Sequence, residues 1–361
     1  MNGWTDSNCG LRALLLQSLE PDFISLNETH LKNDNVITLE GYTWFGQNRN
    51  MHIKAPKASG GVGIFVKDQL LQCFKVTIVD KAVDGILALR FEHRVSQYVF
   101  VIFSCYLSPE GSTRGRDSLT FFSHLLCLVY YLEADAVYIC GDFNSRIADK
   151  EDCLVSDGMP PRIAKDLTLN KHGDTFINFI KDSKCCIVNG RVTPLNDDFT
   201  SISPKGKAVV DYIMVSQDCL NLCTEFQVIT PNDLMENNGP DCLNLLGDRC
   251  KMPDHSLLWL KFKASAERYL TVHPTADISK TRRPRVFPDN FLSSELCCTV
   301  LLDLISNIEA CRVIRRMWIS ATIHFAMCCM QRWIDTLPLR PLSQVKMLDV
   351  SLKVNLFGIM N

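Results

Sequence analysis

The first 263 residues carry a succession of short apolar runs, each closed by glycine or by polar residues, and this pattern constrains the fold more than any other feature. Such runs are typical of strands, whereas helical periodicity is confined to a few stretches. Strands in hairpin-like succession favour a mixed sheet or two packed sheets over an eightfold barrel. The predicted strands cover residues 22–26, 60–66, 85–91, 98–106, 136–140, 186–190, 199–203, 209–216 and 257–263, and the predicted helices cover residues 11–19, 117–133 and 175–181.

The composition changes after Lys263. Residues 279–288, "SKTRRPRVFP", combine basic residues with prolines, which is typical of an exposed linker. Beyond them the pattern becomes helical and rich in Leu, Ile and Cys. A chain of 361 residues, 47% of them hydrophobic, can fill a large core and can hold two domains. We therefore predict a domain over residues 1–263, a basic linker over 264–289, and a helical segment over 290–361 outside the catalytic core.

Three features indicate a chain that is not secreted. Its 17 cysteines are scattered or adjacent with no C-x-x-C pair, which favours reduced thiols over a disulfide framework. The opening residues lack the basic and apolar parts of a secretion signal. The most membrane-like stretch, residues 317–330, falls short of the roughly 20 residues that span a bilayer. We predict a location in the nucleus or cytoplasm and no membrane partner.

Acidic and amide side chains recur where an apolar run ends, and loops at strand ends are where a rigid scaffold presents chemistry. Four stretches share this placement. They hold Glu28 in "LNETH", Asp142 and Asn144 in "GDFN", Asp211 in "VVDY", and Asp254 beside His255 in "PDH".

These residue types suit one reaction. Carboxylate and amide oxygens are the ligands that Mg²⁺ prefers, and such a cation neutralises charge on a phosphate oxygen. His255 could act as a base or donate to a phosphate if Asp211 accepted a hydrogen bond from its second ring nitrogen. The set indicates phosphoester hydrolysis. On the residues alone a structural role stays open, with His255 capping a strand and Asp211 satisfying a buried backbone group.

The order and spacing of "LNETH", "GGVGIFV", "YLSP", "GDFN", "FTS", "VDYIMVS" and "DHSLLWLKF" resemble the endonuclease/exonuclease/phosphatase superfamily, the metal-dependent fold that includes pancreatic deoxyribonuclease and abasic-site endonucleases. The stretch between "GDFN" and "FTS", residues 169–191, resembles the endonuclease domain of animal non-LTR retrotransposons. The resemblance covers about residues 1–263. It implies a four-layer α/β sandwich, with two β-sheets packed face to face, helices outside and a cleft at one edge, followed by the helical C-terminal segment.

Residue by residue, the resemblance implies roles. The metal group comprises Glu28 as the ligand of a divalent cation, Asp254 close to that cation, and Asn2 at the second polar position of the family's opening motif. The catalytic group comprises Asp142, which would orient or deprotonate the attacking water, Asn144, which would hold the phosphate or the water, Tyr106, which would donate to the scissile phosphate, and His255, which would contact the phosphate while Asp211 orients it. For Tyr106, a role as a core tyrosine that ends a strand stays open.

Three departures from the family pattern stand out. The family begins with a strand that ends in Asn-x-(Asn/Asp)-Gly, whereas this sequence opens "MNGW", so the first Asn and its strand are absent. A missing core strand would expose a sheet edge and remove a catalytic hydrogen-bond donor. Pro253 stands where a serine is usual and lacks a backbone N–H. Ala208 replaces a small hydroxyl residue.

The function that the resemblance implies is a Mg²⁺-dependent endonuclease of retrotransposon origin, with Mn²⁺ as a possible substitute, that nicks DNA and leaves a 3′-hydroxyl. The helical tail resembles the start of a connector toward a reverse transcriptase. One alternative is an inositol-phosphate or phospholipid phosphatase, for which Arg146 in "GDFNSR" is the motive. Another is an inactive relic that binds nucleic acid through the basic linker, because a chain of net charge −2 needs a local basic patch for that purpose.

Overall fold

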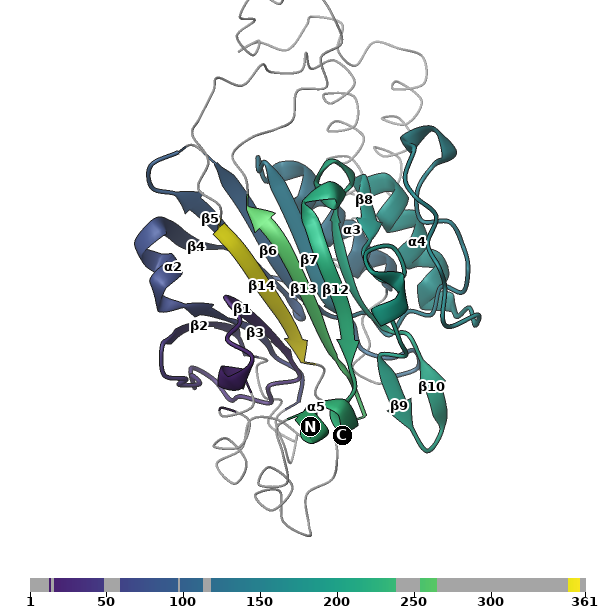
Figure 1. The fold of residues 1–361 in the computed structure, drawn as a ribbon, viewed down its shortest axis with the longest axis horizontal. Coiled ribbons are helices and arrows are strands. Elements are labelled where there is room, and N and C mark those ends of the chain that lie inside the picture. Colours follow the sequence, from purple (N-terminus) through teal and green to yellow (C-terminus); the bar gives the residue numbers. More distant parts are fainter. Residues whose placement is uncertain are drawn as a thin grey trace, which may run out of the picture.

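The computed structural model describes residues 13, 16–48, 59–96, 98–112, 118–237, 254–264 and 350–357. Two six-stranded sheets face each other, and a two-stranded ribbon projects beside them (Figure 1). The ribbon joins β9 (Ser201–Ser203) to β10 (Gly206–Ala208).

The first sheet mixes strands from the two ends of the sequence. Its order is β12-β13-β14-β1-β3-β2, and neighbours are antiparallel except for the parallel pair β14 and β1. The strands are β1 (Phe23–Asn27), β2 (Tyr42–Gln47), β3 (Val62–Lys67), β12 (Cys223–Ile229), β13 (Leu257–Ala264) and β14 (Val350–Phe357).

The second sheet has the order β4-β5-β6-β7-β11-β8. Only β6 and β7 pair in parallel, and the helix α3 (Ser118–Tyr131) makes the crossover that a parallel pair requires. The strands are β4 (Phe74–Asp80), β5 (Ile86–His93), β6 (Val99–Tyr106), β7 (Ala136–Asp142), β8 (Cys185–Ile187) and β11 (Asp211–Ser216). The crossover delivers Asp142 to the end of a central strand.

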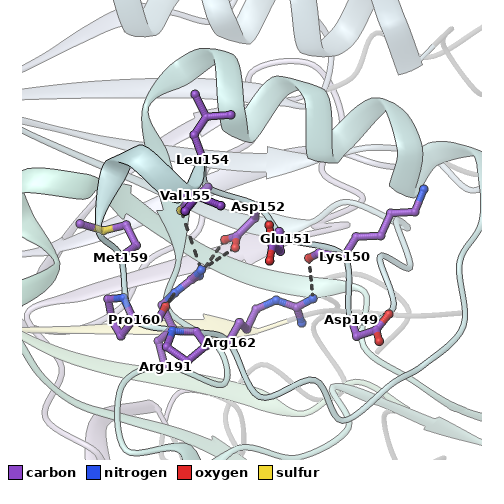
Figure 2. Close-up of a pocket in the computed structure, with 12 residues that line it drawn as sticks. Asp149, Lys150, Glu151, Asp152, Leu154, Val155, Met159, Pro160, Arg162 and Arg191 are labelled. Atoms are coloured by element: carbon purple, nitrogen blue, oxygen red, sulfur yellow. Dashed lines mark hydrogen bonds and ion pairs between the residues drawn. The ribbon is translucent and has the colours of Figure 1, made fainter.

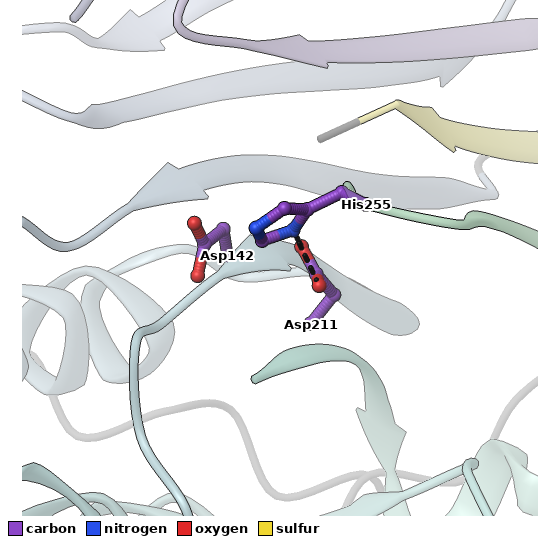
Figure 3. Close-up of side chains that lie close together, drawn as sticks. All are labelled: Asp142, Asp211 and His255. Atoms are coloured by element: carbon purple, nitrogen blue, oxygen red, sulfur yellow. Dashed lines mark hydrogen bonds and ion pairs between the residues drawn. The ribbon is translucent and has the colours of Figure 1, made fainter. Parts of the chain in front are cut away.

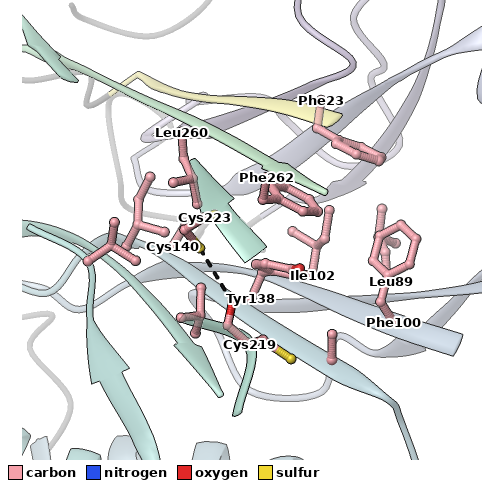
Figure 4. Close-up of a cluster of buried hydrophobic side chains, with 14 of the residues drawn as sticks. Phe23, Leu89, Phe100, Ile102, Tyr138, Cys140, Cys219, Cys223, Leu260 and Phe262 are labelled. Carbon is pink, nitrogen blue, oxygen red and sulfur yellow. Dashed lines mark hydrogen bonds between the residues drawn. The ribbon is translucent and has the colours of Figure 1, made fainter. Parts of the chain in front are cut away.

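The main core lies between the two sheets, where alternate residues of facing strands interdigitate. The rings of Tyr138 in β7 and Phe262 in β13 stack with centroids 4.0 Å apart, and Phe23 and Phe100 lie in the same cluster (Figure 4). Phe91 contacts the rings of both Phe23 and Phe100. Apolar packing therefore fixes one sheet against the other.

Helices cover the outer faces. The helix α3 and α4 (Lys171–Ser183) pack on the second sheet through a cluster that includes Phe122 and Phe176. A smaller cluster that includes Leu16 and Leu234 covers the first sheet, and Leu234 belongs to α5 (Pro231–Asn237). The predicted sandwich of two sheets with helices outside is confirmed. Further helical elements among the described residues are α2 (Asp68–Cys73) and the 3₁₀ turns η1 (Val155–Asp157), η2 (Pro194–Asn196) and η3 (Gln217–Leu222), and residues 16–18 are helical as well.

The tail differs from its predicted form over residues 350–357. We expected a helical segment outside the core, and the structure has instead the strand β14 between β13 and β1. The sequence "VSLKVNLF" alternates apolar and polar residues up to Leu356, which suits a strand more than a helix. The expected open edge beside β1 is therefore paired. Asn2 and Pro253, the linker beyond residue 264 and the predicted helix of residues 290–349 lie outside the described residues.

Among the helices of the described residues, none combines the length and the apolar character needed to cross a membrane.

Truncating Phe262 tests the packing of the two sheets. Phe262 is fully buried, so we expect Phe262→Ala to lower the free energy of unfolding by about 3–5 kcal/mol through lost contacts and a cavity. Urea unfolding followed by tryptophan fluorescence measures the loss. Leu195→Ala, at a side chain 95% exposed, is the control and should stay within about 0.5 kcal/mol of the wild type. Equal effects of the two substitutions would contradict this packing.

Candidate active site

Three polar side chains lie in one row across adjacent strands of the second sheet. Tyr106, the last residue of β6, is the register partner of Asp142 in β7, and Asp142 is the register partner of Asp211 in β11. Residues directly opposite each other on paired strands lie on the same face of the sheet. All three side chains are buried. The strand register thus concentrates two carboxylates and a phenol at one end of the sheet.

In the "GDFN" turn, Asn144 holds the carboxylate of Asp142 by two hydrogen bonds. Asn144 donates its backbone N–H to Asp142 Oδ1 over 2.9 Å and its Nδ2 to Oδ2 over 3.2 Å. The same Nδ2 donates to the carbonyl of Leu107 over 2.8 Å. Gly141 is required one residue earlier, because a Cβ there would lie 1.8 Å from the carbonyl oxygen of Cys105. In this arrangement the Asn144 amide positions Asp142.

Asp211 holds His255. Nδ1 of His255 lies 3.0 Å and 2.8 Å from the two carboxylate oxygens of Asp211, so this ring nitrogen carries the proton that Asp211 accepts. The imidazole lies between Asp211 and Asp142, with its other nitrogen on the side of Asp142 (Figure 3). This geometry differs from a strand cap, the structural role left open for His255 by the sequence.

Backbone pairing fixes the segment that carries His255. A bridge pairs His255 with Ser201 of β9, and the N–H of Ser256 donates to the carbonyl of Thr200 over 2.7 Å. Thr200 also accepts the backbone N–H groups of Val210 and Asp211 on its side-chain oxygen. One threonine therefore connects the histidine segment to the strand that carries its carboxylate partner.

Glu28 joins the site from the first sheet. It follows β1 directly, is 7% exposed and has a left-handed backbone with φ of 54°. The hydroxyl of Tyr106 donates a hydrogen bond to Glu28 Oε1. This contact joins a strand end of the first sheet to a strand end of the second, so the site lies where the edges of both sheets meet.

The buried charges shift the pKa values of their neighbours. Burial, followed by the negative charge of Asp211, raises the pKa of Asp142 well above its usual range, and Glu28 adds to this effect. Burial alone would lower the pKa of His255, but Asp211, Asp142 and Asp254 together raise it to about 9. The site therefore collects negative charge around one imidazolium.

The donor set fits a hard divalent cation. One ligand atom from each of Asp142, Asp211 and His255 lies within 4.8 Å of the others. Since Asp211 already accepts from His255, carboxylate oxygens of Asp142 and Glu28 are better suited to a cation that prefers oxygen. A cation would also offset the burial and the nearby charges of Asp211 and Glu28, which together raise the pKa of Asp142.

The structure brings together six of the predicted site residues. These are Glu28, Tyr106, Asp142, Asn144, Asp211 and His255. Asp254 precedes His255, is partly buried, and contributes its charge to the raised pKa of that histidine. Asn2 lies outside the described residues. The roles of these side chains stay predictions.

Sequence reasoning missed a support that lies behind the "GDFN" turn. Arg146 makes a bidentate ion pair with Asp166, with both N···O distances 2.7 Å, and Asp166 also accepts the N–H of Val209 just before β11. Asn170, the N-cap of α4, accepts the N–H of Arg146 and donates to the carbonyl of Asn144. Only the Asn170 cap has a recognisable sequence signal. Arg146, the motive for the phosphatase alternative, is thus tied into the scaffold.

A pocket lies among the loops of residues 149–162, apart from the candidate site, and none of the site residues lines it (Figure 2). Its main feature is the ion pair of Arg191 with Asp152, 2.5 Å long and almost fully buried. Asp152 also accepts the N–H of Ile187 in β8. Because both partners are engaged, we assign this pair the structural role of anchoring the loop to β8.

Comparison with protein-family models gives a match over most of the chain. Residues 1–234 match the model of the Endonuclease/Exonuclease/phosphatase family. No curated protein matches the chain.

Solved structures give similarities at low identity. The endonuclease domain of TRAS1, a telomere-specific non-LTR retrotransposon, is 13% identical with a TM-score of 0.47, over 71% of this chain and 91% of that one. The AP endonuclease LMAP from Leishmania major is 13% identical with a TM-score of 0.49, over 65% and 81%. The 3′-5′ exonuclease NExo from Neisseria meningitidis is 17% identical with a TM-score of 0.45, over 72% and 96%.

Titration of His255 tests the electrostatics of the site. In metal-free protein we expect its imidazole, followed by NMR, to titrate near pH 9, and Asp211→Asn to lower this pKa because the largest favourable charge is lost. Since the folded pKa exceeds the ordinary 6.5, the pair stabilises the fold fully below about pH 6.5 and loses this contribution as the pH rises through about 9. The control is Asp80→Asn, which removes the partner of His124 and should leave the titration midpoint of His255 unchanged. An unchanged midpoint in Asp211→Asn would contradict the assignment.

Proposed function

Because the chain belongs to the endonuclease/exonuclease/phosphatase family, whose members are hydrolases, we propose that it is a divalent-metal-dependent phosphodiesterase that nicks DNA. The observation that carries this proposal is the row of Tyr106, Asp142 and Asp211 across three paired strands, with His255 and Glu28 beside it. These are the groups that phosphodiester hydrolysis needs at one place: a base for water, donors to the phosphate and oxygen ligands for a cation.

Asp142 is the residue that orients or deprotonates the attacking water. Its carboxylate is fixed by the two donors of Asn144, and burial with the nearby charge of Asp211 raises its pKa, which makes it a stronger base than an exposed aspartate. Tyr106 lies next to it in register and presents a hydroxyl at the same edge, where we place the scissile phosphate.

His255 donates to a phosphate oxygen. Because Asp211 accepts from Nδ1, we place the phosphate oxygen at Nε2, the other ring nitrogen. A pKa of about 9 keeps the imidazole protonated and positively charged at neutral pH, so it suits an anionic phosphate. Asp211 acts by orienting the ring and stabilising its charge.

A divalent cation would be held by Glu28, with Asp254 close to it and Asp142 at the same edge. We propose Mg²⁺, with Mn²⁺ as a substitute, because the donors are carboxylate oxygens. When bound, the cation supplies neutralisation of phosphate charge and of the leaving oxygen. The hydroxyl of Tyr106 donates to Glu28 in this structure, and because it has a single proton, it would redirect that bond to the scissile phosphate once Glu28 binds the cation.

DNA is the substrate that we propose, and the resemblance of residues 169–191 to retrotransposon endonucleases supports it. This segment contributes Asn170, the cap that contacts the backbone on both sides of the "GDFN" turn. We place DNA before the phosphatase alternative, because Asp166 engages the guanidinium of Arg146, its motive, through two hydrogen bonds. With this substrate we propose that the protein is located in the nucleus or the cytoplasm.

A plasmid-nicking assay tests the activity. At low salt with Mg²⁺ we expect relaxation of supercoiled DNA, its loss in EDTA, and a fall of about 10²–10⁴-fold in His255→Ala and Asp142→Asn, the range expected for removal of a general acid or base. His124→Ala is the matched control, since His124 also pairs with an aspartate but lies outside the site. Salt-sensitive DNA binding by a folded wild type that cleaves nothing would support the nucleic-acid-binding relic instead.

Metal binding has a readout independent of catalysis. A cation that binds only the folded chain stabilises it by RT ln(1 + c/Kd) at a cation concentration c, so we expect the unfolding temperature of the wild type to rise with Mg²⁺ concentration. We expect Glu28→Gln to weaken this stabilisation because a ligand charge is lost. Glu92→Gln, at a surface ion pair with Lys75 and Arg90, is the control and should retain the full effect. Identical Mg²⁺ dependence in both variants would exclude Glu28 as a ligand.

A further inference from the structure

The strand β14 occupies the centre of the first sheet although residues 265–349 separate it from β13. All eight of its residues pair antiparallel with β13, from Leu257↔Phe357 to Ala264↔Val350. On its other side it pairs in parallel with β1, from Phe23↔Val354 to Leu26↔Phe357. The strand lies between the purple β1 and the green β13 (Figure 1).

The register of β14 matches its sequence pattern. The apolar residues of β14 are register partners of β13 residues that belong to the core between the sheets. The pairs are Leu352↔Phe262, Val354↔Leu260 and Leu356↔Leu258. Alternating with them, Lys353 is the partner of Lys261, which is partly exposed. A shift by one residue would exchange these two sets, so the pattern specifies this register.

The strands on either side of β14 each lead to a candidate site residue. Glu28 follows β1 directly, and His255 lies two residues before the start of β13. Because β14 runs parallel to β1, it ends beside Leu26 and Leu257, at the same edge of the sheet. Without a strand in this position, β1 and β13 would present two rows of unpaired backbone groups in the middle of the sheet.

We propose that the space between β1 and β13 is a strand-binding site, occupied in this chain by its own residues 350–357, whose occupant fixes β1 relative to β13. Its ligand class is an extended peptide that runs parallel to β1 with apolar residues at alternate positions. The long connection between β13 and β14 allows the strand to be supplied by a covalently separate segment. The occupancy of the site is independent of the proposed function, whereas its effect on catalysis rests on it.

Cleavage of the full chain tests the site directly. A specific protease site is inserted within residues 279–288, and the folded protein is then cut at this site. We expect the C-terminal fragment to co-elute with the rest in native gel filtration and to separate in urea. A labelled peptide of residues 348–361 should exchange into the cleaved protein, and a scrambled peptide should not. Release of the fragment with unchanged amide exchange in β1 and β13 would overturn the proposal.

Two substitutions in the intact chain provide the second test. Val354 is the partner of Phe23 and Leu260, both fully buried, so Val354→Asp should speed amide exchange in β1 and β13 by roughly tenfold or more. Lys353→Glu, opposite Lys261, should leave their exchange unchanged. Equal exchange in both variants would show that β14 does not occupy the site. If Val354→Asp does not fold, the cleaved chain still decides.

DNA nicking separates this proposal from the proposed function. We expect cleaved protein stripped of its fragment to lose nicking and to recover it with the peptide of residues 348–361. Peptide binding without nicking in any form, the intact chain included, would leave the strand site in place and overturn the nuclease. Nicking that survives complete removal of the fragment would overturn the link between β14 and catalysis.

Discussion

The register of β6, β7 and β11 is the constraint on which the candidate site depends. Tyr106, Asp142 and Asp211 meet because each is the register partner of the next on adjacent strands, and a slip of one residue would send Asp142 to the opposite face of the sheet. The register is held by apolar residues of the same strands, such as Tyr138, which lies on the same face as Asp142 and packs against the facing sheet. Core packing and site geometry therefore depend on the same strand register.

Burial of so many polar groups requires that each be matched with a partner, and the partners explain much of the local structure. Asn144 adopts a left-handed backbone, with φ of 46°, in the conformation from which it donates twice to Asp142. Asp166 shares its carboxylate between Arg146 and the backbone before β11. These supports leave the site rigid, which favours chemistry that depends on fixed positions of donors and bases.

Local patterns in the sequence predicted many of these strands, whereas the pairing of strands that lie far apart in the sequence was not predicted. The apolar runs that lead to Glu28 and Asp142 are strands, because a short apolar run and a following turn are local signals. Strands β2, β4 and β12 escaped prediction, since their mixed burial breaks the apolar runs. The alternation in residues 350–357 could have indicated a strand, but no pattern names the partners of a strand whose neighbours lie so far away in sequence. Asp166 carries no motif at all.

The central position of β14 has a consequence for the order of events during synthesis. The residues of β1 leave the ribosome early, yet their neighbour in the sheet is made only when residue 357 is reached. At about 5–20 residues per second this interval is on the order of tens of seconds. During that time the side of β1 that pairs with β14 is open, and the facing side of β13 is open from residue 264 onward, so both stay accessible to other chains for longer than strands with local partners do.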